Sequence, residues 1–201
     1  MSSPRVTAAR FVYAGSAALA VGWRHALGAS ALHDGAPLGG THAIALPLAL
    51  SVGALGGVAV TALSRVIVRR TAWGAAMRDA LAEGLAGVPV ERLAGLALAA
   101  AVGEELFFRG ALLPTLTGPL GFGGAALATS VLFGLLHLPS TPALRPWTAS
   151  AMVMGLLFAL LYRLTGEVAA PLAAHAVINL ENLDLLRAER ARGAPEGPRP
   201  A

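Results

Sequence analysis

Long apolar runs separated by short polar breaks extend along almost the whole chain. An α-helix needs about 20 mostly apolar residues to cross the roughly 30 Å hydrocarbon core of a bilayer. The runs have about this length, and no stretch alternates apolar and polar residues as a half-buried strand would. The pattern therefore predicts an all-α, polytopic membrane bundle of about six transmembrane helices. The runs occupy residues 11–32, 43–64, 93–113, 120–138, 147–162 and 167–186.

The first run, 11–32, has two interpretations. A basic start, a short apolar core and the small residues at 28–31 fit a cleaved signal peptide. We prefer a retained first helix, because Arg24 and His25 fit poorly in a cleavage region and the next apolar run follows within ten residues.

Residues 71–90, between the second and third runs, mix charged side chains such as Arg78, Asp79 and Glu83 with apolar ones. This mixture is typical of an amphipathic helix that lies along a membrane surface. A plain connector between two transmembrane helices explains the segment equally well.

Arginine clusters set the expected orientation of the bundle. By the positive-inside rule they mark the cytoplasmic side, which places both ends of a six-helix chain in the cytoplasm. Arg24 and Arg163 fall on the opposite side and weaken this assignment. The clusters are Arg65, Arg69 and Arg70 after the second run, and Arg187, Arg190 and Arg192 at the start of the tail.

Composition narrows the class further. The chain is 56% hydrophobic and 13% charged, with a mean hydropathy of +0.67, whereas soluble domains contain about 25% charged residues. The net charge of +4 suits anionic lipid headgroups. The absence of cysteine excludes disulfides and thiolate chemistry. No basic patch interleaved with aromatic residues occurs, so nucleic acid is not an expected partner.

Three charged residues interrupt the third apolar run: Glu104, Glu105 and Arg109. Each charge at the centre of a membrane helix costs roughly 2.5–3.5 kcal/mol, so such a cluster must be paired or must face a wet cavity. Arg109 follows Glu105 by four residues and shares its helix face. This pairing would neutralise Glu105 and leave Glu104 free.

Three further polar side chains lie deep in later apolar runs: His137, His175 and Asn179. His175 and Asn179 are four residues apart and share one helix face. Together with Glu104 they suggest a hydrolytic site. Glu104 and His137 would take a proton from water, and His175 and Asn179 would donate hydrogen bonds to an oxyanion.

The residue pattern leaves the use of a metal open. It contains no HExxH motif and no serine nucleophile beside a base. One glutamate and two histidines can nevertheless hold a divalent metal such as zinc in an open three-ligand site. The candidate ligands are Glu104, His137 and His175, and spacing does not distinguish a metal-bound water from a carboxylate-activated one.

These residues form three motifs in order: EExxxR ending at Arg109, FxxxH from Phe133 to His137, and HxxxN from His175 to Asn179. Each motif lies in its own apolar run. In this respect the chain resembles the CPBP family of intramembrane proteases, also called Abi, which includes CAAX prenyl proteases and bacteriocin-processing proteins. The resemblance covers about residues 91–183.

The resemblance implies an all-helical fold with a conical cavity that opens to the cytoplasm within the membrane. It also implies endopeptidase activity in which Glu104 and His137 activate water while His175 and Asn179 stabilise the oxyanion. Supporting roles are expected for Glu105, Arg109 and Phe133. Phe133 is expected to pack beside His137.

The sequence as a whole then divides into three parts. Residues 1–90 are expected to hold N-terminal transmembrane helices and the amphipathic connector, and residues 91–186 the helical core that resembles the family. Residues 187–201, rich in arginine, proline and glycine, are predicted to be a disordered cytoplasmic tail.

The hypothesis is a multi-pass endopeptidase of a bacterial inner membrane that cleaves a membrane-associated peptide or protein at the cytoplasmic side. One alternative is a non-enzymatic immunity or scaffold protein of the same fold. Another is a small transporter whose charged cluster relays protons, although no two-fold hydropathy repeat supports it. The substrate, its prenylation and the oligomeric state are not specified by the sequence.

Overall fold

The part of the chain that the structure describes, residues 4–33, 42–85 and 88–193 of a computed structural model, contains helices and no strands. The all-α prediction is confirmed. A π-helical segment, η1 (Leu106–Leu112), joins α4 to α5, and a 3-10 turn, η2 (Pro142–Leu144), precedes α6. The α-helices are α1 (Pro4–Ala26), α2 (Leu46–Arg70), α3 (Ala72–Gly84), α4 (Val90–Glu105), α5 (Leu113–Leu136), α6 (Arg145–Thr165) and α7 (Ala169–Gly193).

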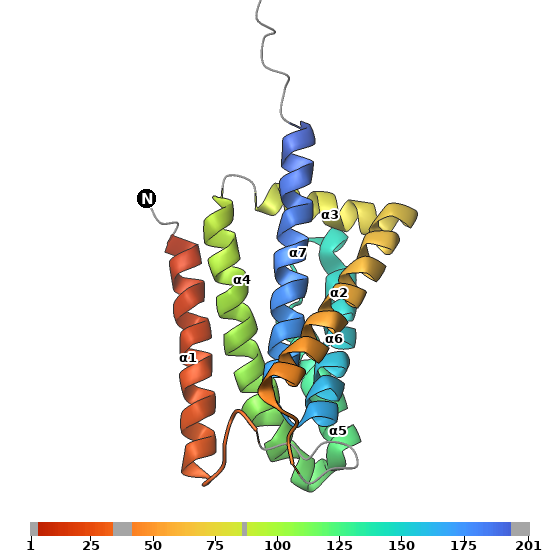
Figure 1. Cartoon of the computed structure of the whole chain (residues 1–201). Helices are drawn as coiled ribbons and strands as arrows, with labels where there is room; N and C mark the ends of the chain where they lie inside the picture. The colour runs from red at the N-terminus through yellow and green to blue at the C-terminus, as the bar shows by residue number, and fades with distance from the viewer. Residues whose placement is uncertain (1–3, 34–41, 86–87, 194–201) are drawn as a thin grey trace, which may run out of the picture.

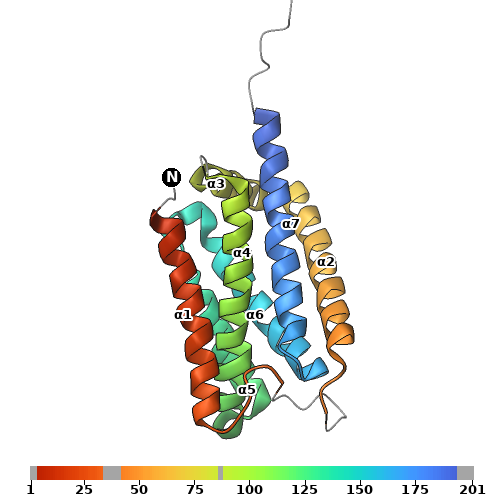
Figure 2. The ribbon, with the colours of Figure 1, turned by 60° about the vertical axis from the view of Figure 1, so that its left-hand side comes forward.

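The long helices run roughly alongside one another, whereas α3 lies across one end of the bundle (Figure 1). The start of α1 and the end of α7 lie at the same end as α3. Figure 2 shows α1, α4, α7 and α2 in a row, with α5 and α6 behind them. Contacts between α1 and α4, α4 and α7, and α2 and α7 connect the row, and α5 packs against α6.

Helix α3 has the position expected of a surface helix, because it covers the end of the bundle instead of running within it. Thr71 begins it as an N-cap, accepting a 3.1 Å hydrogen bond from the backbone N–H of Gly74. Its half-exposed Trp73 and Arg78 give it a mixed surface. A helix is therefore present within residues 71–90, for which a surface helix and a plain connector were equally good explanations, and its placement at a membrane surface stays a prediction.

Three helical stretches in the described ranges are long and apolar enough to cross a membrane, judged by length and composition. They are Leu46–Arg70, Glu91–Leu136 and Pro142–Thr165. Large apolar side chains such as Phe11, Leu55 and Leu136 are about two-thirds or more exposed on the outside of the bundle. Extended exposed apolar surface of this kind marks a membrane or a partner, and the full count of six crossings stays a prediction.

The break between the third and fourth apolar runs falls later than residues 114–119, which separate these runs in the sequence. The helical run continues through η1 and Pro114 into α5, and the backbone leaves helical geometry at Gly121 (φ 66°, ψ 165°). A proline ring inside a helix clashes with the carbonyl group four residues earlier. The π-helical turn just before Pro114 widens the backbone and accommodates that ring. Glycine adopts the positive φ at position 121 without strain.

The end of the last helix also differs from expectation. Helix α7 continues to Gly193, past the expected end of the last apolar run at residue 186. Part of the tail that was predicted to be disordered is therefore helical. Residues 194–201 lie outside the described part of the chain.

Small residues allow the closest helix contacts. On α2, a Cβ atom added at Gly57 would lie 2.8 Å from the Ala174 carbonyl oxygen of α7, and one at Gly53 would overlap the Ala170 carbonyl group. Glycine spaced by four residues is typical of tightly packed membrane helices. These two contacts hold α7, which carries His175, against α2.

Candidate active site

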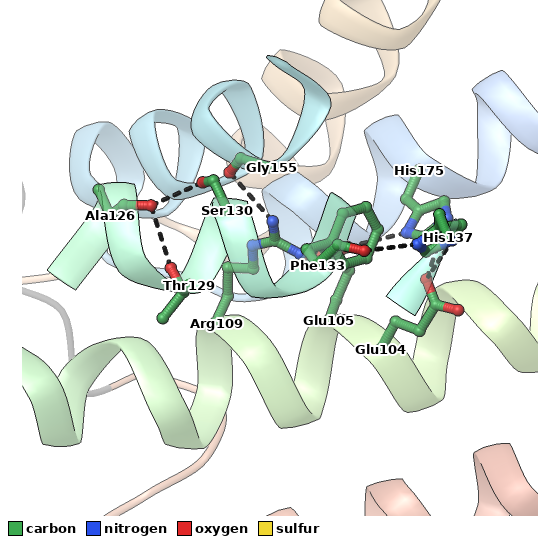
Figure 3. Close-up of polar contacts among 10 residues, drawn as sticks. All are labelled: Glu104, Glu105, Arg109, Ala126, Thr129, Ser130, Phe133, His137, Gly155 and His175. Atoms are coloured by element: carbon green, nitrogen blue, oxygen red, sulfur yellow. Dashed lines mark hydrogen bonds and ion pairs between the residues drawn. The ribbon is translucent and has the colours of Figure 1, made fainter. Parts of the chain in front are cut away.

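The two neighbouring glutamates at the end of α4 point to different partners. Glu104 and Glu105 are the last residues of α4, and Arg109 follows in the π-helical segment η1. Consecutive residues of a helix project about 100° apart, so the Glu104 carboxylate faces Nε2 of both histidines, while the Glu105 carboxylate contacts Arg109 and Nδ1 of His175 (Figure 3). Short π-helical segments recur at functional sites, which makes η1 itself a marker of this region.

The Glu104 carboxylate faces the side chains of two histidines from different helices. Its Oε2 atom lies 3.9 Å from Nε2 of His137, at the end of α5, and 3.8 Å from Nε2 of His175 on α7. These distances exceed a direct hydrogen bond, and the buried Oε2 has no hydrogen-bond partner among the described residues. His137 is the most accessible of the three side chains, 24% exposed. Three separate helices thus bring these polar groups together.

Glu105 and Arg109 form the fully buried side of the cluster. Glu105 Oε1 accepts hydrogen bonds from Arg109 Nη1 (3.0 Å) and from His175 Nδ1 (2.8 Å). Arg109 Nη2 also donates to the Gly155 carbonyl oxygen on α6 (3.0 Å). Both charged side chains are completely buried. The ion pair inferred from the four-residue spacing is present, and it ties η1 to α6 and α7.

Aromatic rings surround this ion pair. The Arg109 guanidinium lies 4.8 Å from the ring centroid of Phe133 and 5.2 Å from that of Phe158, distances typical of cation–π contacts. The Phe158 ring stacks on the His175 imidazole with the centroids 5.1 Å apart. Sequence reasoning did not single out Phe158, because a phenylalanine in an apolar run gives no sign that its ring covers a histidine.

The two histidines are held in defined tautomers. His137 Nδ1 lies 2.7 Å from the Phe133 carbonyl oxygen, which can only accept, so Nδ1 must donate. His175 Nδ1 likewise donates to the Glu105 carboxylate. Each Nε2 atom therefore faces Glu104, with a lone pair in the neutral imidazole and a proton only in the imidazolium. Phe133 was expected to pack beside His137; its ring does so, and its carbonyl group also orients that histidine.

Asn179 lies one turn beyond His175 on α7 and contacts a different group. Its Nδ2 atom donates to the Ala97 carbonyl oxygen of α4 at 3.3 Å. The structure therefore brings Glu104, His137 and His175 together, and it engages the Asn179 amide with the backbone of α4.

Tyr13 of α1 also contacts the site. Its side chain interacts with the Glu104 carboxylate through the phenolic hydroxyl group. The sequence gives no signal for this contact, because Tyr13 is far from the three motifs along the chain and lies in the first apolar run.

The geometry does not assemble the candidate metal ligands into a site. Among the residues that the structure describes, no group of three or more His, Cys, Asp or Glu side chains is placed so that it could hold a metal ion. Glu104, His137 and His175 approach one another through single atoms, Oε2 and the two Nε2 atoms.

Comparison with known proteins gives one match. The family model described as type II CAAX prenyl endopeptidase Rce1-like matches residues 87–180. This stretch contains all three motifs, from Glu104 to Asn179. No curated protein and no solved structure matched the chain. Residues 87–180 therefore form a domain of the type II CAAX prenyl endopeptidase Rce1-like family.

Proposed function

We propose that the chain is an intramembrane endopeptidase that hydrolyses a peptide bond of a membrane-associated peptide or protein. The observation that carries the proposal is the convergence of the Glu104 carboxylate with Nε2 of His137 and Nε2 of His175 inside an apolar helical bundle. Its occurrence in a domain of an endopeptidase family supports the same reaction.

Glu104 is the proposed general base. A water oxygen about 2.8 Å from both Glu104 Oε2 and His137 Nε2 is compatible with the 3.9 Å separation of those atoms. As this oxygen bonds to the substrate carbonyl carbon, its proton passes to Glu104. When the C–N bond breaks, the same proton passes to the leaving amine nitrogen, so that a carboxyl and an amino product are released.

His175 is the proposed donor to the oxyanion. Because its Nδ1–H is given to Glu105, it donates from Nε2 only as the imidazolium. The positive charge of that form would offset the second carboxylate of the cluster, since Arg109 is paired with Glu105. A positive donor aimed at developing negative charge stabilises the tetrahedral intermediate. Asn179 would join as a second donor by releasing the Ala97 carbonyl oxygen.

The proposed setting is a bacterial inner membrane, crossed six times with both chain ends and α3 at the cytoplasmic side. The arginine clusters support this orientation. Glu104 lies about 21 Å along α4 from Val90, given a rise of 1.5 Å per residue, which would be well inside a hydrocarbon core of roughly 30 Å with Val90 at its cytoplasmic edge. The site would then be reached from the cytoplasm. In this arrangement the N-terminal helices are residues 1–90, the catalytic core is residues 91–186 and the tail is residues 187–201.

The test compares wild type with Glu104→Gln, which removes the base and keeps the size of the side chain. Loss of a general base lowers turnover by about 10²–10⁴-fold. Mass spectrometry of membrane peptides from cells carrying either form should show a substrate that accumulates only with the variant. Glu91→Gln, an exposed acid in the first turn of the same helix, is the matched control and should cleave like wild type. Wild-type cleavage by folded Glu104→Gln would refute the proposal.

A further inference from the structure

We propose that Tyr13, in a helix outside the family domain, is a positioning residue that holds the Glu104 carboxylate in the orientation needed for catalysis. The inference rests on the proposed function and extends it, because it assigns part of the active site to α1.

The backbones of α1 and α4 meet beside Glu104. A Cβ atom added at Gly103 would lie 2.5 Å from the Tyr13 carbonyl oxygen and 2.9 Å from its Cα atom. Only a glycine permits this approach, because any side chain at position 103 would overlap the main chain of α1. The contact therefore fixes Tyr13 directly next to the residue that carries the carboxylate.

Two further contacts hold α1 in this position. Arg10, one turn before Tyr13, donates from Nη2 to the Arg92 carbonyl oxygen of α4 at 3.2 Å. At the other end, the Ala31 carbonyl group that follows α1 lies against Gly110 of η1, where an added Cβ atom would overlap it. Helix α1 is thus packed along α4 and η1 on both sides of Tyr13.

The Tyr13 hydroxyl group is half-buried and interacts with the Glu104 carboxylate. A carboxylate only accepts hydrogen bonds, so the phenol donates. Glu104 Oε2 has no hydrogen-bond partner in the described part of the chain. A hydroxyl group that holds the carboxylate while Oε2 keeps facing both histidines would restrain it in the reactive orientation. A glutamate has three side-chain torsions, and restraint of its carboxylate raises the fraction of molecules ready to react.

The experiment measures kcat and KM for wild type, Tyr13→Phe, Tyr162→Phe and Glu104→Gln. The full-length protein is purified in detergent, and the substrate is the peptide that accumulates in cells carrying Glu104→Gln. Tyr162→Phe is the matched control: it removes the other tyrosine hydroxyl group, which is buried without a hydrogen-bond partner among the described residues. We expect Tyr13→Phe to lower kcat roughly 10- to 100-fold, the effect of losing one hydrogen bond to a charged group. KM and the melting temperature should stay unchanged, and Tyr162→Phe should retain wild-type kcat.

Each alternative result has a distinct meaning. Wild-type kcat in Tyr13→Phe, with Glu104→Gln inactive, overturns the role of Tyr13 and leaves the proposed function intact. Activity in Glu104→Gln overturns both. A structural role for the hydroxyl group would appear as a fall in kcat that comes with one of three signs. These are an equal fall in Tyr162→Phe, a lower melting temperature, or failure of Tyr13→Phe to accumulate as folded protein. Each of them also overturns the inference.

Discussion

Replacement of Arg109 by methionine tests whether the buried ion pair supports the site. The guanidinium is completely buried, donates to Glu105 Oε1 and to the Gly155 carbonyl oxygen, and lies between aromatic rings. Methionine keeps an unbranched apolar chain among those rings, so the substitution mainly removes the charge. Glu105 would then be a buried carboxylate with only the His175 imidazole beside it.

The expected cost follows from these contacts. Removing one partner of a buried ion pair costs about 3–5 kcal/mol, because the other charge is left without compensation. For a chain of this size each kcal/mol corresponds to about 2–4 °C in melting temperature. Arg109→Met should therefore melt roughly 6–20 °C below wild type, and its peptidase activity should fall as His175 loses its fixed orientation.

The assay is thermal unfolding in detergent at one heating rate, with Arg78→Met as the control. Arg78 forms an ion pair with Asp79 on α3, where the two side chains are 30% and 67% exposed, and solvent-accessible pairs contribute about 0–1 kcal/mol. The double variant Arg109→Met/Glu105→Gln should recover part of the lost stability, because it removes both buried charges.

Three outcomes would refute this reasoning. An unchanged melting temperature in Arg109→Met would show that the pair does not stabilise the fold. Equal destabilisation by Arg109→Met and by Arg78→Met would show that burial does not determine the effect of losing the charge. Additive losses in the double variant would mean that Arg109 and Glu105 are not energetically coupled.

Two further predictions concern helix packing and metals. Gly57→Val should lower the melting temperature, because its Cβ would overlap α7 and over-packing costs about 1–3 kcal/mol. Gly56→Ala should melt like wild type, because the nearest atom to its added Cβ is on Leu161 at 3.8 Å. Equal melting temperatures of the two variants would contradict the α2–α7 contact. Treatment with a chelator should leave cleavage unchanged, because the described residues form no group that could hold a metal ion. Stoichiometric metal in the active protein, with loss of activity when the metal is removed, would contradict this prediction.

The sequence was informative wherever a polar group stood in an apolar run. Charges and imidazoles are costly in such surroundings, so Glu104, His137 and His175 could be selected by their setting alone. The four-residue spacing of Glu105 and Arg109 predicted their ion pair, because this spacing brings side chains together on one helix face. These parts follow from local geometry, which the sequence specifies directly.

The other features of the site and fold depend on contacts between segments that are distant in the sequence. Asn179 shares a helix face with His175 but donates to Ala97, because α4 passes beside that turn of α7. Tyr13 and Phe158 reach the site through packing of α1 and α6, for which a single sequence contains no spacing rule. The helical run passes Pro114 and breaks at Gly121, and propensities do not predict the π-helical form of the backbone upstream.

The π-helical segment has a consequence for how the chain tolerates changes in length. Its wider turn contains more residues than an α-helical turn, so the angular register of everything after Leu112 is shifted relative to Glu104 and Glu105. Deleting a single residue within 110–112 would permit an ordinary α-helix and would rotate the start of α5, including the buried Leu113, by about 100° relative to the carboxylates. A deletion that costs little in most loops would here misalign α5 with the ion pair without altering any of the side chains in that pair.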